Sequence, residues 1–202
     1  MNKPTQPLFF DIETTGLPEK NAAWETDFRL GFPYIVSISW IYKDQIYDII
    51  INQEGRTIPE DAIKIHGITN EMAASSQYKL KDILALFMGH AMESDAIIGH
   101  NVYFDISTLK ANVLREFEKD PDIVQVKEFI CKALDKDKRI DTMQKSTKFC
   151  NIKTEGSNRI KWPTLSELYY KLFNDSFHAH NGKEDVLATR KCYYELVKLE
   201  VI

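Results

Sequence analysis

Hydrophobic residues are arranged first in short runs and later with a helical period. The run from Leu8 to Glu13 predicts a buried strand, which ends at the turn residues 14–18. After a loop at 19–33, two further apolar runs occupy 34–42 and 45–51, joined by Lys43-Asp44. Such a pair predicts an antiparallel hairpin.

From residue 59 onward the pattern favours helices. A spacing of i, i+3, i+4 and i+7 predicts helices over 80–92 and 105–117, with a short helix at 59–65 and a short strand at 96–99. Thr164-x-x-Glu167 is a capping box that opens a helix ending at 173, and a last helix follows His180. Strands, a hairpin and then helices alternating with a short strand indicate an α/β fold, a mixed sheet with helices on its faces.

Composition narrows the class of protein. The chain has 202 residues, of which 44% are hydrophobic and 28% charged, so we expect one globular domain over 1–202. A net charge of −4 excludes a polybasic binder of duplex nucleic acid. Three cysteines without a C-x-x-C exclude a disulfide scaffold and fit a reducing compartment. Since no signal peptide or membrane span is visible, we expect a cytoplasmic protein.

One segment departs from the acidic average. Residues 132–161 hold nine basic and four acidic residues, so this segment could hold a nucleic-acid backbone or form a solvated face. Trp162 and the Tyr169-Tyr170 pair follow it. They could stack on bases, although aromatic residues beside a capping box more often pack in the core.

Acidic residues supply the candidate chemistry. Asp11 and Glu13 alternate in an apolar strand, so they share one face with Cα atoms roughly 7 Å apart. Asp105 follows the strand at 96–99 and is expected to open a helix, where an acid is also a common cap. Asp185 lies about one turn into the last helix, five residues after His180.

Together these residues predict a two-metal site. Four carboxylates and no His/Cys cluster favour Mg²⁺ or Mn²⁺ over Zn²⁺. Two such ions about 4 Å apart activate a water and stabilise the leaving oxygen of a phosphodiester. A neutral imidazole at His180 could take the proton of that water.

The ordered motifs resemble a known family. They are Phe10-Asp11-Ile12-Glu13-Thr14-Thr15-Gly16-Leu17, His100-Asn101-x-x-Phe104-Asp105 and His180-x4-Asp185, with Ile65-His66-Gly67-Ile68-Thr69 between the first two. In this order they resemble the DEDD superfamily of 3′–5′ exonucleases, histidine subclass (DEDDh), and are similar to the proofreading epsilon subunit of bacterial DNA polymerase III.

The resemblance implies a ribonuclease-H-like fold with a five-stranded mixed sheet. It implies Asp11, Glu13, Asp105 and Asp185 as metal and catalytic residues and His180 as the general base. Thr14, Leu17, His66, Asn101 and Phe104 are the implied substrate-binding residues. The implied reaction releases nucleoside 5′-monophosphates from single-stranded DNA 3′ ends, with a polymerase or repair protein as the implied partner.

Two departures from the family pattern stand out. About 74 residues separate the second and third motifs, so we expect a basic insertion at about 120–161. His178 lies two residues before His180 and is the reserve candidate for the base.

Three other functions stay open at this point. An exoribonuclease acting on short RNA or tRNA 3′ ends would use the same fold, and discrimination would depend on contacts to the 2′-OH. A non-catalytic nucleic-acid-binding module would bind strands without releasing nucleotides. A structural α/β domain would use its acids only as helix caps.

Overall fold

The apolar runs form the strands of one mixed sheet. This computed structural model describes residues 3–154 and 156–202, and within them the strand order is β3-β2-β1-β4-β5. The strands are β1 (Pro7–Thr14), β2 (Ile35–Tyr42), β3 (Gln45–Ile50), β4 (Ala96–Gly99) and β5 (Arg139–Asp141). β1, β4 and β5 are parallel, whereas β2 pairs antiparallel with both β1 and β3. The prediction of a five-stranded mixed sheet is therefore confirmed.

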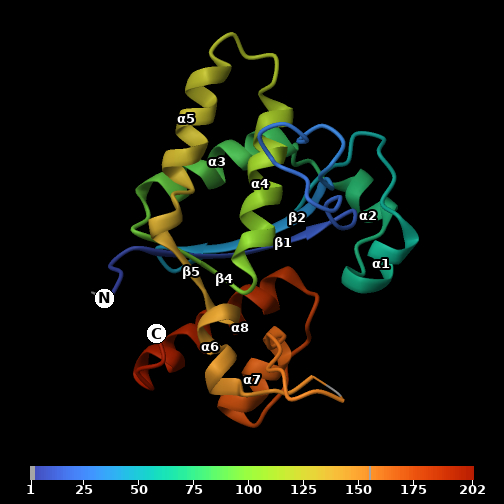
Figure 1. Ribbon diagram of the computed structural model, residues 1–202. Coiled ribbons are helices and arrows are strands. Elements are labelled where there is room, and N and C mark those ends of the chain that lie inside the picture. Colours follow the sequence, from blue (N-terminus) through green and yellow to red (C-terminus); the bar gives the residue numbers. More distant parts are fainter. Residues whose placement is uncertain (1–2, 155) are drawn as a thin grey trace.

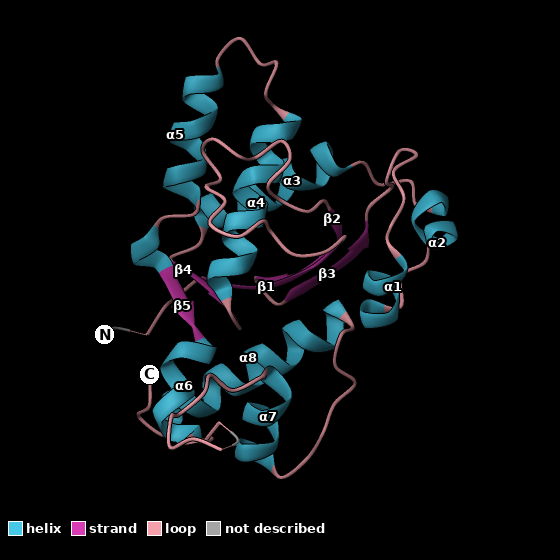
Figure 2. Ribbon diagram, turned by 45° about the vertical axis from the view of Figure 1, so that its right-hand side comes forward, coloured by secondary structure: helices cyan, strands magenta, loops and turns pink. Residues whose placement is uncertain are grey.

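Helices cover both faces of this sheet (Figures 1 and 2). They are α1 (Glu60–His66), α2 (Asn70–Ser75), α3 (Leu80–Glu93), α4 (Val102–Glu116), α5 (Ile123–Ala133), α6 (Thr142–Cys150), α7 (Leu165–Phe173) and α8 (Gly182–Lys198), with a 3₁₀ turn at Lys136–Lys138. Figure 2 shows α3, α4 and α5 on one side of the strands, and α6, α7 and α8 on the other. Among the described residues, no helix is long and apolar enough to cross a membrane.

β1 is covered by helices on both faces of the sheet. Its side chains point alternately to the two faces, so successive residues contact opposite helix layers. Leu8, Phe10 and Ile12 pack in the core that α3 and α4 complete. Phe9 packs on the opposite side, with Val186 and Tyr193 of α8. Because side chains alternate along a strand, Asp11 and Glu13 lie on the α8 side with Phe9.

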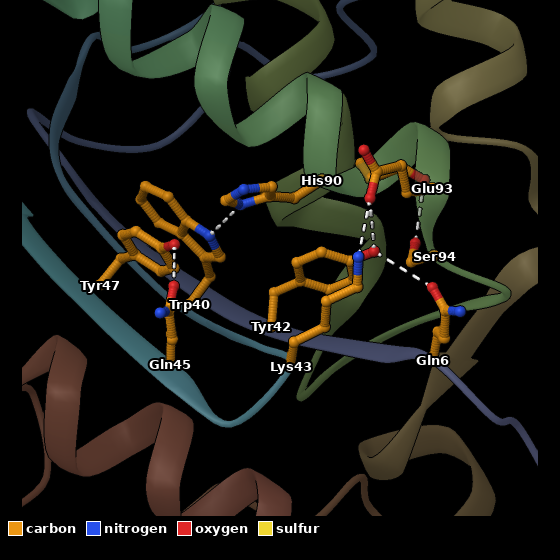
Figure 3. A network of polar contacts seen from close by, with 10 residues as sticks. Gln6, Trp40, Tyr42, Lys43, Gln45, Tyr47, His90, Glu93 and Ser94 are labelled. Atoms are coloured by element: carbon orange, nitrogen blue, oxygen red, sulfur yellow. Dashed lines mark hydrogen bonds and ion pairs between the residues drawn. The ribbon is translucent and has the colours of Figure 1, made fainter.

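The β2–β3 hairpin anchors α3 (Figure 3). Trp40 Nε1 donates to Nδ1 of His90 at 3.0 Å, and the imidazole stacks on the Tyr42 ring at 4.8 Å. Tyr42 Oη and Lys43 Nζ both donate to Glu93 Oε2 at 3.0 Å. Burial lowers the pKa of His90 and keeps its ring neutral, which leaves Nδ1 free to accept.

Several elements differ from the sequence prediction. α4 begins at Val102, so Asp105 lies inside its first turn and does not open it. Asn101 adopts a left-handed backbone with φ 68°, which turns the chain from β4 into α4 within two residues. The pattern did not predict α2, α5, α6 or β5. The predicted insertion at 120–161 contains α5 and α6, but also β5, which is an edge strand of the sheet.

Candidate active site

The carboxyl ends of the three parallel strands meet at one edge of the sheet. β1 ends at Thr14, β4 at Gly99 and β5 at Asp141, and the last two lead directly into α4 and α6. In α/β sheets, this edge is where functional side chains gather. The predicted acids come from β1, from the first turn of α4 and from the first turn of α8, which packs across β1.

Three of the four acids converge at this edge. A carboxylate oxygen each from Asp11, Glu13 and Asp185 lies within 4.8 Å of the others. Asp185 reaches them from α8, whose N-terminus is capped by Asn181 Oδ1, the acceptor for Glu184 N at 3.2 Å. Residues some 170 positions apart in sequence therefore share one small volume.

Asp105 faces the same cluster from α4 but does not belong to that three-residue group. Its side chain is buried, with 4% of the residue exposed. Burial raises the pKa of Asp105 well above its usual range, and the charges of Glu13 and Asp141 raise it further. Asp105 in turn raises the pKa of Asp11. These mutual effects place the fourth acid within electrostatic reach of the other three.

Burial also raises the pKa values of the other acids. The pKa of Glu13 rises to about 7, mainly from burial and then from the charge of Asp185. The pKa of Asp185 rises to about 6 from burial, although His180 and His178 partly offset this. Burial and the neighbouring carboxylates also hold the pKa of Asp11 well above its usual range.

This donor set fits divalent cations. Buried carboxylates that repel each other are stabilised by a cation among them, because the cation replaces the protons they would otherwise retain. Their ligand atoms are hard oxygens, which suit Mg²⁺ or Mn²⁺. Asp11, Glu13 and Asp185 are placed to share one ion, and Asp105 is placed beside them.

Two histidines stand beside Asp185. His180 and His178 are both exposed on the segment that precedes α8, and both lower the pKa of Asp185 by their charge. His180 has a left-handed backbone with φ 63°, and its backbone also lowers the pKa of Asp185. Both the predicted base and the reserve candidate are therefore within electrostatic reach of Asp185.

His66 approaches the site from the end of α1. It is buried, with Nδ1 accepting from Ile68 N at 3.0 Å, so the neutral ring carries its proton on Nε2. That Nε2 atom is buried without a hydrogen-bond partner among the described residues. Burial lowers the pKa of His66, and the backbone of Thr14 partly offsets this. His66 therefore presents an N–H donor near the end of β1.

The remaining predicted substrate contacts surround the same edge. Thr14 Oγ1 donates to Gly16 O at 2.7 Å, which shapes the turn that carries Leu17. Leu17 is 82% exposed, three residues beyond the end of β1. Asn101 is exposed at the start of α4, whereas Phe104 is half-buried against the main core.

Asp141 is a site residue that the sequence reasoning missed. Its Oδ1 accepts from the backbone N–H groups of Asn101, Met143 and Gln144 at 3.1, 2.9 and 3.3 Å. Its Oδ2 is buried without a hydrogen-bond partner among the described residues, and its charge acts on Asp105. Asp141 thus ties the start of α4 to the start of α6. The sequence did contain a signal for Asp141: it directly follows an apolar residue and precedes a helical segment.

Known proteins share this arrangement. A model of the RNase_T exonuclease family matches residues 8–193, from β1 to α8. The chain therefore belongs to this exonuclease family, and the predicted membership of the DEDD 3′–5′ exonucleases is confirmed.

Two relatives are DNA polymerase III epsilon subunits. The protein from Pasteurella multocida is 29% identical over 106 residues, which cover 52% of this chain and 41% of the relative. The protein from Haemophilus influenzae is 30% identical over 106 residues, which cover 52% of this chain and 40% of the relative. The matched part thus spans about two fifths of the length of these relatives.

Solved structures of exonuclease I have the same fold. A product-bound form has a TM-score of 0.69 at 18% identity, covering 98% of this chain and 45% of that chain. E. coli exonuclease I in complex with a dA16 oligonucleotide has a TM-score of 0.68 at 18% identity, covering 96% of this chain and 41% of that one. The enzyme from Methylocaldum szegediense has a TM-score of 0.64 at 18% identity, with coverages of 96% and 40%. The predicted ribonuclease-H-like fold is confirmed.

Proposed function

We propose that this chain is a metal-dependent 3′–5′ exonuclease that releases nucleoside 5′-monophosphates from single-stranded DNA 3′ ends, and that residues 1–202 form a single exonuclease domain. The observation that carries the proposal is the convergence of Asp11, Glu13 and Asp185, whose oxygens lie within 4.8 Å of one another. Family membership over 8–193 supports the reaction class.

The acids would hold the cations, and His180 is the proposed base. Asp11, Glu13, Asp105 and Asp185 would bind two Mg²⁺ or Mn²⁺ ions. When bound, such a pair supplies an activated water and stabilises the charge that develops on the leaving oxygen. His180, exposed next to Asp185, accepts the proton of the attacking water.

The other predicted residues would hold the terminal nucleotide. Leu17 presents an exposed apolar side chain on which a base can lie. The buried Nε2–H of His66 is a donor with an open partner position, which suits an oxygen of the terminal sugar or phosphate. Thr14, Asn101 and Phe104 complete the proposed contacts.

The relatives support DNA as the substrate. Exonuclease I has been solved with oligonucleotides, including dA16 and single-stranded DNA with zinc. The epsilon relatives are subunits of DNA polymerase III, so we propose a polymerase or repair protein as a partner of this chain.

A digestion experiment tests the proposal. Matched 5′-labelled DNA and RNA single strands are incubated with the protein and Mg²⁺ or Mn²⁺, and the released products are identified by mass. We expect 5′-monophosphates, with DNA shortened faster than RNA. Asp11→Asn should abolish release, whereas Asp82→Asn, the same change on the exposed side of α3, should retain it. Faster digestion of RNA would instead support the exoribonuclease.

A further inference from the structure

The described residues between α6 and α7 form a paired hairpin, here called the basic hairpin (residues 151–154 and 156–163). Lys153 bridges Ile160 in antiparallel fashion. Thr154 N donates to Arg159 O at 2.8 Å, and Lys161 N donates to Ile152 O at 2.9 Å. In Figure 1 this segment extends past α7, on the α8 side of the sheet. Its backbone pairing gives it a defined shape.

The base of the basic hairpin is attached to the edge that carries the acids. His100, directly after β4, bonds through Nε2 to the carbonyl of Pro163 at 3.0 Å. Because a carbonyl only accepts, Nε2 carries the proton, while Nδ1 lies 3.0 Å from Thr142 Oγ1, whose hydroxyl donates to Gly99 O. Asp105 lies five residues further along the chain from His100. Pro163 is therefore fixed beside the start of α4.

A second attachment fixes the residue on the other side of Trp162. Lys161 Nζ pairs with Glu167 Oε1 at 2.6 Å, and Glu167 is also the acid of the capping box that opens α7. Trp162 thus stands between two anchored neighbours, yet it is 63% exposed. The expectation that these aromatic residues pack in the core is wrong for Trp162 and for Tyr170, which is also exposed, while it holds for the buried Tyr169. An exposed ring on a fixed backbone loses little freedom when a flat partner stacks on it.

The surface around Trp162 is cationic. Lys153 and Arg159 are exposed on the basic hairpin, and Lys148 is exposed on α6 just before it. They belong to the segment 132–161, which has nine basic and four acidic residues in a chain of net charge −4. An exposed aromatic ring among cations combines base stacking with phosphate attraction, which is how proteins bind single strands without sequence preference.

We propose that the basic hairpin binds the single strand upstream of the 3′ end that occupies the acidic site, with Trp162 stacking on a base and Arg159 and Lys153 contacting phosphates. This inference rests on the proposed exonuclease function and adds a second contact region for the same substrate. The hairpin is attached to the acidic edge through His100, so a strand leaving the site can reach it.

Dependence on substrate length tests the stacking. KM is measured for a dinucleotide and for a 12-nucleotide DNA strand. We expect wild-type protein to have a lower KM for the longer strand than for the dinucleotide. In Trp162→Ala, the ratio of these two KM values, which is the length advantage, should shrink by at least about 5-fold. The matched control is Tyr78→Ala, which removes an exposed ring on the loop before α3 and should keep the advantage. Melting temperatures show whether each variant is folded.

Salt dependence tests the phosphate contacts. Binding of the longer strand to the Lys153→Gln/Arg159→Gln variant is compared with binding to Lys119→Gln/Lys127→Gln, which makes the same charge change at exposed positions outside the segment 132–161. For a single strand, we expect the slope of log affinity against log salt to fall by about 0.7 for each lost phosphate contact, and only in the hairpin variant.

The outcomes separate the inference from the proposed function. If wild-type protein cleaves neither substrate, the exonuclease proposal fails, while anisotropy of the labelled strand still tests binding by the hairpin. If Trp162→Ala retains the full length advantage, or both double variants give the wild-type salt slope, the hairpin does not bind the strand. That result would leave it as a surface for a different kind of partner, such as an acidic protein.

Discussion

At the scale of single residues, two histidines compete for the role of base. Both act on the pKa of Asp185, His180 more strongly than His178, and His180 has φ 63°, in the left-handed region. Asparagine tolerates this conformation, so His180→Asn removes the imidazole with little backbone strain. We expect its kcat on a short DNA strand to fall by about 10² to 10⁴. Rates measured with saturating substrate and Mg²⁺ check this.

His178→Asn is the matched control for that experiment. It makes the same change two residues earlier, and we expect its kcat to stay within a few-fold of wild type. If His178→Asn is the slower variant, the roles of the two histidines are reversed. Equal, small effects would mean that neither ring accepts the proton.

Asp141 gives a prediction about stability. Asp141→Ala removes the acceptor of three backbone N–H groups at the starts of α4 and α6, whereas Asp141→Asn keeps an oxygen for them. We expect the alanine variant to lose about 2 kcal/mol of unfolding free energy in urea, and the asparagine variant to lose less than half of that. Equal losses in the two variants would argue against the capping role.

The sequence predicted residues whose chemistry is local and missed those defined by packing. Asp11 and Glu13 could be found because alternation in a strand puts them on one face. Asp141 could not, because its strand has only three residues and too little pattern to place it at the sheet edge. Trp162 looked like a core residue, since neither the Lys161–Glu167 pair nor the His100–Pro163 bond can be inferred from spacing.

At the scale of elements, the position of α8 depends on a glycine. Gly182 is the first residue of α8, and a Cβ there would overlap Ser39 Oγ on β2. We expect Gly182→Ala to cost about 1–3 kcal/mol of unfolding free energy. Activity should fall as well, because the displaced helix start carries Asp185. Urea denaturation and the rate on a short strand measure the two effects.

Two variants test the cause of that loss. Gly89→Ala, inside α3 where an added Cβ meets open space, should instead stabilise the protein by about 0.5–1 kcal/mol. Ser39→Ala combined with Gly182→Ala removes the overlapping hydroxyl and should recover part of the lost stability and activity. Additive losses in the double variant would contradict the proposed contact.

Elements with a regular apolar pattern or a clear start signal were predictable, and elements with neither were not. α3 and α8 bury a regular stripe over 14 and 17 residues, so their period is visible in the sequence. α2 has six residues and buries only Ala73, while α5 buries only Ile130 and Ala133. Such elements are stabilised by what they pack against, which no local pattern contains.

At the scale of the whole molecule, the fold concentrates negative charge in one buried place. The acids from β1, α4 and α8 repel each other, and burial raises their pKa values, so the metal-free protein loses stability when they ionise. An acid with a higher pKa in the folded than in the unfolded state binds its proton more tightly when folded. Its contribution is therefore lost as pH rises through the folded-state pKa.

Three histidines affect the pH dependence of stability in the opposite direction to the acids. They therefore determine how the effect of the acids can be measured. Burial lowers the pKa values of His66, His90 and His100, so these rings destabilise the fold when they are protonated, below about pH 6.5. In the unfolded state they lose their protons around pH 6.5, so up to about one unit above that pH they still make stability rise with pH. Comparison with Glu13→Gln, which keeps all three histidines, therefore isolates the contribution of Glu13, whose pKa is about 7.

Metal removal then gives a prediction with a definite sign. In EDTA we expect the melting temperature of the wild-type protein to fall relative to that of Glu13→Gln between pH 6.5 and 8, by about 2–4 °C for each kcal/mol lost. Added Mg²⁺ or Mn²⁺ should raise it, and more strongly at pH 8, because ionised carboxylates bind the cation without first releasing protons. Glu13→Gln should weaken the gain from metal. A difference in melting temperature between the two proteins in EDTA that is independent of pH, with neither cation changing the wild-type value, would mean that the four acids do not form one electrostatic unit.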